Sequence, residues 1–114
     1  MAESILNEIK KLVNVASDYE HFNTDILIHA NSAFSRLHQL GVGPKKPFIL
    51  TDDTQTWDEF FEGKKHIQNV KTYIGLYVRM MFDTPQSGGM ISVYEKEINK
   101  LEWLLNVAVD PSEV

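Results

Sequence analysis

The fold class of this chain follows from residues 66–106, which have the sequence HIQNVKTYIGLYVRMMFDTPQSGGMISVYEKEINKLEWLLN. Two sets of apolar residues in this stretch recur at spacings of mostly three and four, which is typical of a narrow helical packing seam. The first set is Ile67, Val70, Ile74, Tyr77, Val78 and Met81, and the second set is Ile91, Tyr94, Ile98, Leu101 and Leu105. Because the linker from Asp83 to Gly89 is short, the two helices are expected to be antiparallel neighbours. The stretch therefore predicts a long antiparallel helical hairpin.

Two further helices are expected upstream of the hairpin. Apolar residues at helical spacing predict an amphipathic surface helix over about residues 4–16. A second helix is predicted from about residue 23 to residue 40, with capping side chains in Asn23–Asp25. Gly41 stands where a left-handed C-cap is expected, and Pro44 prevents the helix from continuing. This second helix is expected to pack alongside the hairpin.

The segment between the second helix and the hairpin is less regular. Residues 47–51 (PFILT) fit either a short strand or an extended connector, and the pattern leaves both open. Thr56 is expected to cap a short helix over residues 57–62. The connector 45–55 and the tail from about residue 107 lack a helical stripe and contain proline, so both are expected to become ordered only on docking.

Taken together, these patterns predict an all-α fold: a small helical bundle with a long antiparallel hairpin at about residues 66–106. The length of 114 residues fits one helical domain, residues 1–114, with a flexible tail from about residue 107. The chain has no internal repeat and no low-complexity tract.

The composition excludes several classes of function. Without cysteine there is no disulfide, thiolate metal site or cysteine nucleophile. No apolar run approaches the roughly 20 residues that span a bilayer, and residues 1–12 do not resemble a signal peptide. The formal net charge is −5, and tight duplex binding depends on lysine and arginine that neutralise phosphates. The sequence therefore predicts no membrane partner and no specific binding of DNA.

Three sets of residues are candidates for chemical sites. Asp25 and His29 lie one helical turn apart, but a surface ion pair explains them better than a metal site or a general base. The carboxylates of residues 58, 59 and 62 suit magnesium, but no second carboxylate group completes such a cluster. Gly88–Gly89 lack the lysine and the preceding strand of a phosphate loop, and a tight turn explains them better. No catalytic, cofactor-binding or metal-binding residue is assigned, and no enzymatic activity is predicted.

Four aromatic residues are candidates for a protein interface. Trp57, Phe60 and Phe61 form a dense cluster in the short helix, where they either close one end of the core or anchor a partner. Trp103 falls beside the seam of the last helix, so packing within the chain and a subunit contact are both open.

Several stretches together resemble the head–tail connector proteins (adaptor or head-completion proteins) of long-tailed double-stranded DNA bacteriophages. The matching pieces are Asp25–Ser32, Leu40–Pro44, Thr56–Trp57 with Asp58 and Phe60, Val70–Ile74 with Val78–Asp83 and Pro85, and Glu95–Ile98 leading into Leu101–Asn106. They span about three-quarters of the chain in the order of the family. Residues 45–55 and the tail beyond Asn106 match nothing in that pattern.

The resemblance implies a structural, non-enzymatic subunit of the virion head–tail junction, present in the host cytoplasm before assembly. It implies a homo-oligomeric ring under the portal protein, which extends the DNA channel and docks a stopper or tail-completion protein. DNA would pass through an acidic ring without being bound specifically. The alternatives left open are a small helical protein-binding regulator resembling an antitoxin and, less favoured, a carboxylate-metal nucleotide hydrolase.

Overall fold

The computed structural model describes residues 4–16, 18–62, 68–82 and 87–108. Within them the chain forms the helices α1 (Ile5–Leu12), α2 (Asn23–Gln39), α3 (Trp57–Phe61), α4 (Gln68–Phe82) and α5 (Gly88–Ala108). The described residues contain no strand, only an isolated antiparallel bridge between Ser4 and Thr56. The predicted all-α fold is confirmed.

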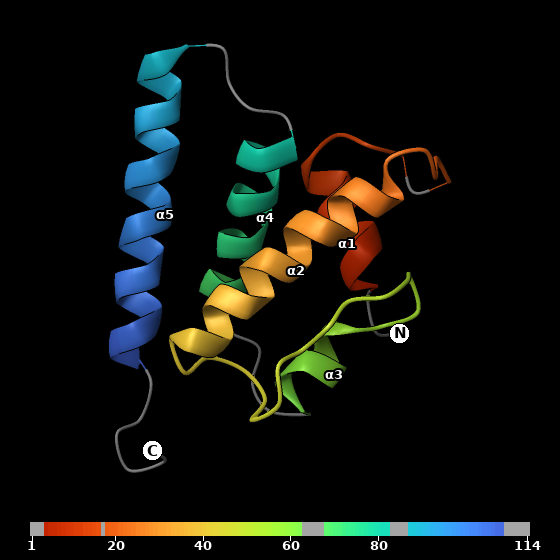
Figure 1. Cartoon of the computed structure of the whole chain (residues 1–114), viewed down its shortest axis with the longest axis horizontal. Coiled ribbons are helices and arrows are strands. Elements are labelled where there is room, and N and C mark those ends of the chain that lie inside the picture. Colours follow the sequence, from red (N-terminus) through yellow and green to blue (C-terminus); the bar gives the residue numbers. More distant parts are fainter. Residues whose placement is uncertain (1–3, 17, 63–67, 83–86, 109–114) are drawn as a thin grey trace.

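The helices α4 and α5 form the predicted hairpin (Figure 1). The two lie side by side and run in opposite directions, while α2 crosses α4 and α1 lies on the side of α4 away from α5. The molecule measures 42 × 35 × 20 Å, and 20 Å is about two helix diameters. Because α4 contacts α1, α2 and α5, it lies at the centre of the fold, and α5 stands at one edge.

The hydrophobic core lies where α1, α2, α3 and α4 meet. Each of these helices contributes at least one fully buried apolar side chain, such as Ile9, Phe34, Phe60 and Ile74. The helix α5 contributes Ile98, Leu101 and Leu105, which pack against this core from one side. All three belong to the second predicted apolar seam, so the inward face of the helix was predicted correctly.

The C-terminal end of α2 was predicted correctly and its N-terminal end was not. Gly41 has a φ of 83°, and the bonds from its amide to His38 and from the Val42 amide to Leu37 form a Schellman motif. At the other end Phe22 is the N-cap and no side chain caps the helix. The expected caps are wrong because α2 already includes Asn23–Asp25 in its first turn, where Asp25 still favours the helix dipole.

The ends of the two short helices differ from their predicted positions by a few residues. The helix α1 ends at Leu12 instead of about residue 16, because the chain turns away through Asn14, which has a φ of 63°. The helix α3 begins as predicted, with the Thr56 hydroxyl accepting the Glu59 amide at 3.3 Å. It ends at Phe61, one residue early, because Glu62 adopts a left-handed conformation.

Residues 47–51 are a connector and not a strand. The Asn31 side chain takes the place of a neighbouring strand: its amide donates to the Leu50 carbonyl at 2.9 Å and its oxygen accepts the Leu50 amide at 2.7 Å. The Gln55 side chain accepts the Thr51 amide and donates to the Ile49 carbonyl. The expectation that this connector becomes ordered only on docking is wrong, because α2 and its own turn already hold it.

The helix α5 is longer than predicted at both ends. It begins at Gly88, so Gly88–Gly89 form its first turn and not part of the preceding loop. It also includes Val107 and Ala108, which were expected to belong to the tail. Residues 109–114, the rest of the predicted flexible tail, lie outside the described residues.

Candidate subunit-contact surface

The structure places the aromatic cluster of α3 in the core. The exposed fractions of Trp57, Phe60 and Phe61 are 2%, 1% and 7%. The Phe60 ring packs edge to face on the rings of Trp57 and Phe61, and its centroid also lies 5.2 Å from that of Phe34 in α2. Of the two interpretations of this cluster, burial favours the core.

Two polar contacts fasten the cluster to its neighbours. The Trp57 indole N–H donates to the Glu8 carboxylate of α1 at 2.8 Å, and the Lys71 ammonium of α4 lies 5.4 Å from the indole centroid. A buried indole N–H needs such a partner, and an ammonium over its face adds a cation–π attraction. The short helix α3 is thereby bound to both α1 and α4.

Trp103 has the opposite environment. Its side chain in α5 is 65% exposed, the largest exposed fraction among the large hydrophobic residues of the described chain. Val107 lies one turn further along the same helix face and is 56% exposed. An exposed indole next to an exposed valine is the kind of aromatic anchor that dominates protein interfaces.

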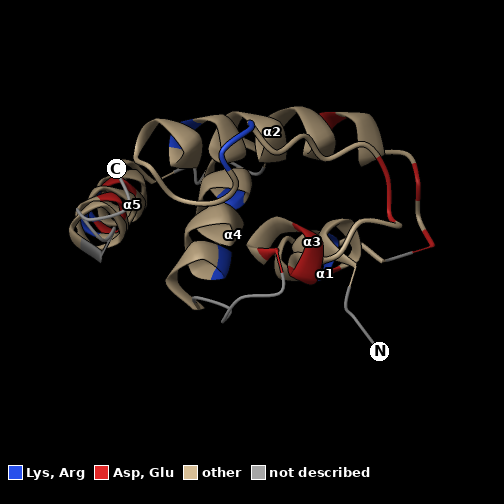
Figure 2. Ribbon diagram, turned by 90° about the horizontal axis from the view of Figure 1, so that it is seen from below, with Lys and Arg blue, Asp and Glu red and all other residues tan. Residues whose placement is uncertain are grey.

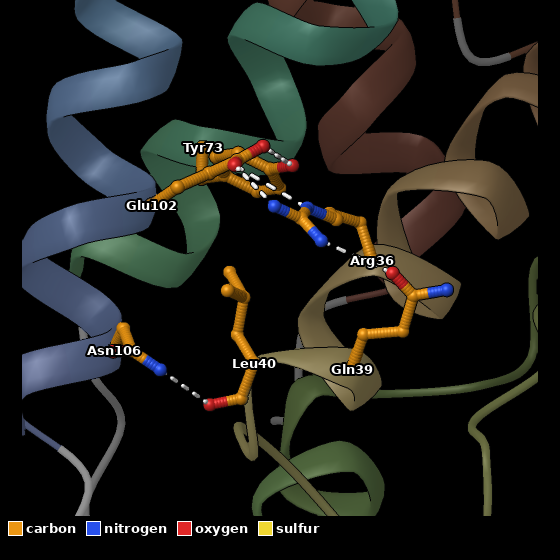
Figure 3. A network of polar contacts seen from close by, with 6 residues as sticks. All are labelled: Arg36, Gln39, Leu40, Tyr73, Glu102 and Asn106. Carbon is orange, nitrogen blue, oxygen red and sulfur yellow. Dashed lines mark hydrogen bonds and ion pairs between the residues drawn. The ribbon is translucent and has the colours of Figure 1, made fainter.

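A polar network fixes the position of α5 (Figure 3). The Glu102 carboxylate accepts the Tyr73 hydroxyl of α4 at 2.8 Å and pairs with the Arg36 guanidinium of α2 at 3.1 Å. One turn further on, the Asn106 amide donates to the Leu40 carbonyl at the end of α2, at 3.4 Å. Glu102 therefore joins the three long helices at a single point.

Electrostatics match this geometry. Burial, reinforced by the hydrogen bond to Glu102, raises the pKa of the Tyr73 hydroxyl well above its ordinary value. The hydrogen bond to Glu102 also raises the pKa of Arg36, whose side chain is half exposed. Neither shift belongs to a group poised to transfer a proton near neutral pH, so the network positions helices.

The part of the chain that the structure describes assembles no candidate site for a metal ion. Among the described residues no group of three or more His, Asp or Glu side chains is close enough to hold a metal ion. The ion pair expected between Asp25 and His29 is not formed in the described structure, although both residues are described. In the described chain, no helix has the length and apolar character needed to cross a membrane.

Comparison with known proteins places the chain in a family. A sequence model of the phage connector protein family matches residues 5–112. The chain belongs to the phage connector protein family. The match covers all five helices, including the exposed face of α5.

Membership of the phage connector family supports a structural role that involves contact with other head or tail proteins of a phage. It favours a non-enzymatic protein located at the head–tail junction. No curated protein matches the chain. No solved structure matches it either. The contact surfaces of this connector must therefore be derived from its own side chains.

The sequence identified the four aromatic candidates but could not show which of them are buried and which are exposed. Trp57 and Trp103 both stand in helices next to carboxylates, and only packing separates the buried indole from the exposed one. It also missed Glu102, which joins α2, α4 and α5. The available signal was its place one residue after Leu101, on the border of the predicted apolar stripe of this helix.

Proposed function

We propose that this chain is one subunit of a ring that lies below the portal protein at the capsid vertex. The ring extends the channel through which DNA passes and offers a docking surface to a stopper or tail-completion protein. The family match over residues 5–112 supports a connector role, and the exposure of α5 supports self-assembly.

The observation that supports the proposed ring is that α5 packs against the bundle with only one of its faces. This helix has 21 residues, yet its buried side chains Ile98, Leu101 and Leu105 all lie on one face. Its other face exposes Val93, Trp103 and Val107. A ring subunit must keep such surfaces open, because head-to-tail closure uses two different patches on every copy.

The charge of the chain suits a channel that does not hold DNA. With 16 acidic and 11 basic residues, the subunit offers few anchors for phosphates, which dominate non-specific DNA affinity. Acidic side chains that face the channel would let DNA slide. Replacing them with lysine is expected to slow DNA passage, and an unchanged rate of ejection would remove this part of the proposal.

The test is the mass of the purified protein, measured by light scattering over a wide range of concentrations. The concentrated fraction is imaged by negative-stain electron microscopy. Closed rings with a central hole support the proposal. If the protein stays monomeric, purified portal protein is added, and rings that form only on the portal also support it. A protein that stays monomeric and forms no ring on the portal protein contradicts the proposal.

A further inference from the structure

The helix α5 carries two packing seams on opposite faces. The inner seam is Ile91, Tyr94, Ile98, Leu101 and Leu105; the last three pack in the core, and the first two are half-buried. Two residues after each of these come Val93, Lys96, Lys100, Trp103 and Val107, here called the outer seam. A step of two residues is a turn of about 200° around a helix. The outer seam therefore repeats the three-four spacing of the inner seam on the opposite face.

All five residues of the outer seam are exposed. The apolar ones, Val93, Trp103 and Val107, are exposed by 50%, 65% and 56%. Between them lie Lys96 and Lys100, and no acidic residue belongs to the seam. A partner must offer apolar surface flanked by acids, because this seam is apolar at its ends and basic in the middle.

The opposite edge of the molecule has this character (Figure 2). The loop from α1 to α2 exposes Asp18 and Glu20, and Asp25 is exposed in the first turn of α2. Tyr19, which is 49% exposed, lies between Asp18 and Glu20 in the sequence. We name Asp18, Tyr19, Glu20 and Asp25 the acidic edge. Figures 1 and 2 place the N-terminal end of α2, with the loop residues just before it, and α5 at opposite ends of the 42 Å axis.

A hollow next to the acidic edge could receive a bulky side chain. It has a volume of about 820 Å³ and is lined by Ser4, Asn7, Glu8, Lys11, Leu12, Val15 and Ala16. A space of this size is comparable to a small-molecule site and exceeds what an indole ring fills. The exposed Trp103 is the largest apolar side chain of the outer seam.

We propose that the outer seam of α5 docks on the acidic edge of a second copy of this chain. This inference rests on the proposed ring and names its contact surfaces. The two patches lie at opposite ends of one subunit, so the contact is head-to-tail and can continue from copy to copy. A two-fold contact through α5 is disfavoured, because it would place Lys96 and Lys100 against the same lysines of the partner.

The experiment reverses the charges of each patch in turn. One variant carries Lys96→Glu and Lys100→Glu, a second carries Asp18→Lys and Glu20→Lys, and a third carries all four substitutions. The four positions are exposed, so the fold is expected to survive. A matched control for the first variant, Lys45→Glu with Lys46→Glu, makes the same change in net charge at two exposed lysines elsewhere.

Self-association is measured by sedimentation velocity, alone and with purified portal protein. Like charges face each other in each double variant, so we expect its association to weaken by about 100-fold. The fourfold variant and an equimolar mixture of the two double variants should recover assembly to within about tenfold of the natural chain. The control should assemble like the natural chain.

The outcomes separate this inference from the proposed ring. If the natural chain forms rings and the seam variant forms them equally well, or the fourfold variant does not recover, the assigned surfaces are wrong and the ring remains. If the seam variant loses portal binding while the edge variant keeps it, the outer seam docks the portal and not a second copy. If the natural chain forms no assembly, alone or on the portal, both proposals fail.

Discussion

Replacing Tyr73 with phenylalanine tests whether the Glu102 network holds α5 in place. The Tyr73 side chain is fully buried and its hydroxyl donates to the Glu102 carboxylate at 2.8 Å. A hydrogen bond to a charged group contributes about 1.5–3 kcal/mol. We expect a loss of about 1.5 kcal/mol in the free energy of unfolding at pH 8, because Glu102 keeps Arg36 as a partner.

The same variant predicts a specific dependence on pH. The pKa of Tyr73 is raised in the folded protein, so the unfolded chain loses this proton first as the pH increases. Stability from Tyr73 is therefore complete below its ordinary pKa of about 10 and decreases above it. At pH 11 the loss amounts to about 1.4 kcal/mol. The phenylalanine variant has no such proton, so the difference between the two proteins should approach zero at pH 11.

The assay is urea unfolding of both proteins, followed by circular dichroism at pH 8, 9, 10 and 11. All other side chains are common to the two proteins, so their contributions cancel in the difference. Arg36→Ala is the matched control: it removes an exposed ion pair, so it should cost no more than about 1 kcal/mol. A difference between natural chain and Tyr73→Phe that stays constant from pH 8 to pH 11 would refute the reasoning.

Three further substitutions test the packing of the monomer by urea unfolding. Gly43→Ala should cost more than about 2 kcal/mol, because Gly43 has a φ of 100° and a Cβ there would lie 2.7 Å from the Phe60 Cζ. Asn31→Ala should cost about 2 kcal/mol and speed hydrogen exchange at the Leu50 amide, because both hydrogen bonds to Leu50 are lost. Trp103→Ala should change the stability of the monomer by less than about 0.5 kcal/mol, because its side chain is exposed.

Each of these has a control in the same chain. A Cβ added at Gly88 would have no atom within 4 Å, so Gly88→Ala should not destabilise the protein. Asn31→Asp keeps the oxygen that accepts the Leu50 amide and should keep that amide protected from exchange. Trp57→Ala empties a core site and should cost about 3–5 kcal/mol. If Trp103→Ala were as damaging as Trp57→Ala, the assignment of Trp103 to an open surface would be wrong.

The sequence by itself determined the features that depend on neighbours along the chain. Apolar residues at three-four spacing form a stripe on any helix, so the hairpin and the inner seam of α5 could be predicted. The stop at Gly41 and the cap at Thr56 need only local backbone chemistry, and both were found. The errors at helix ends are equally local: Asn14 and Glu62 adopt left-handed conformations that their residue types only weakly favour.

Tertiary structure alone decided which side chains remain exposed. Trp57 is buried because α1, α2 and α4 converge on α3, whereas Trp103 is exposed because only one face of α5 meets the bundle. Residues 47–51 could not be resolved from their own pattern, because their hydrogen-bond partner is the side chain of Asn31, far away in sequence. The burial of a side chain and its hydrogen-bond partners depend on residues that are distant in the sequence. The periodicity of apolar residues predicts the faces of a helix, but not which face packs against another helix.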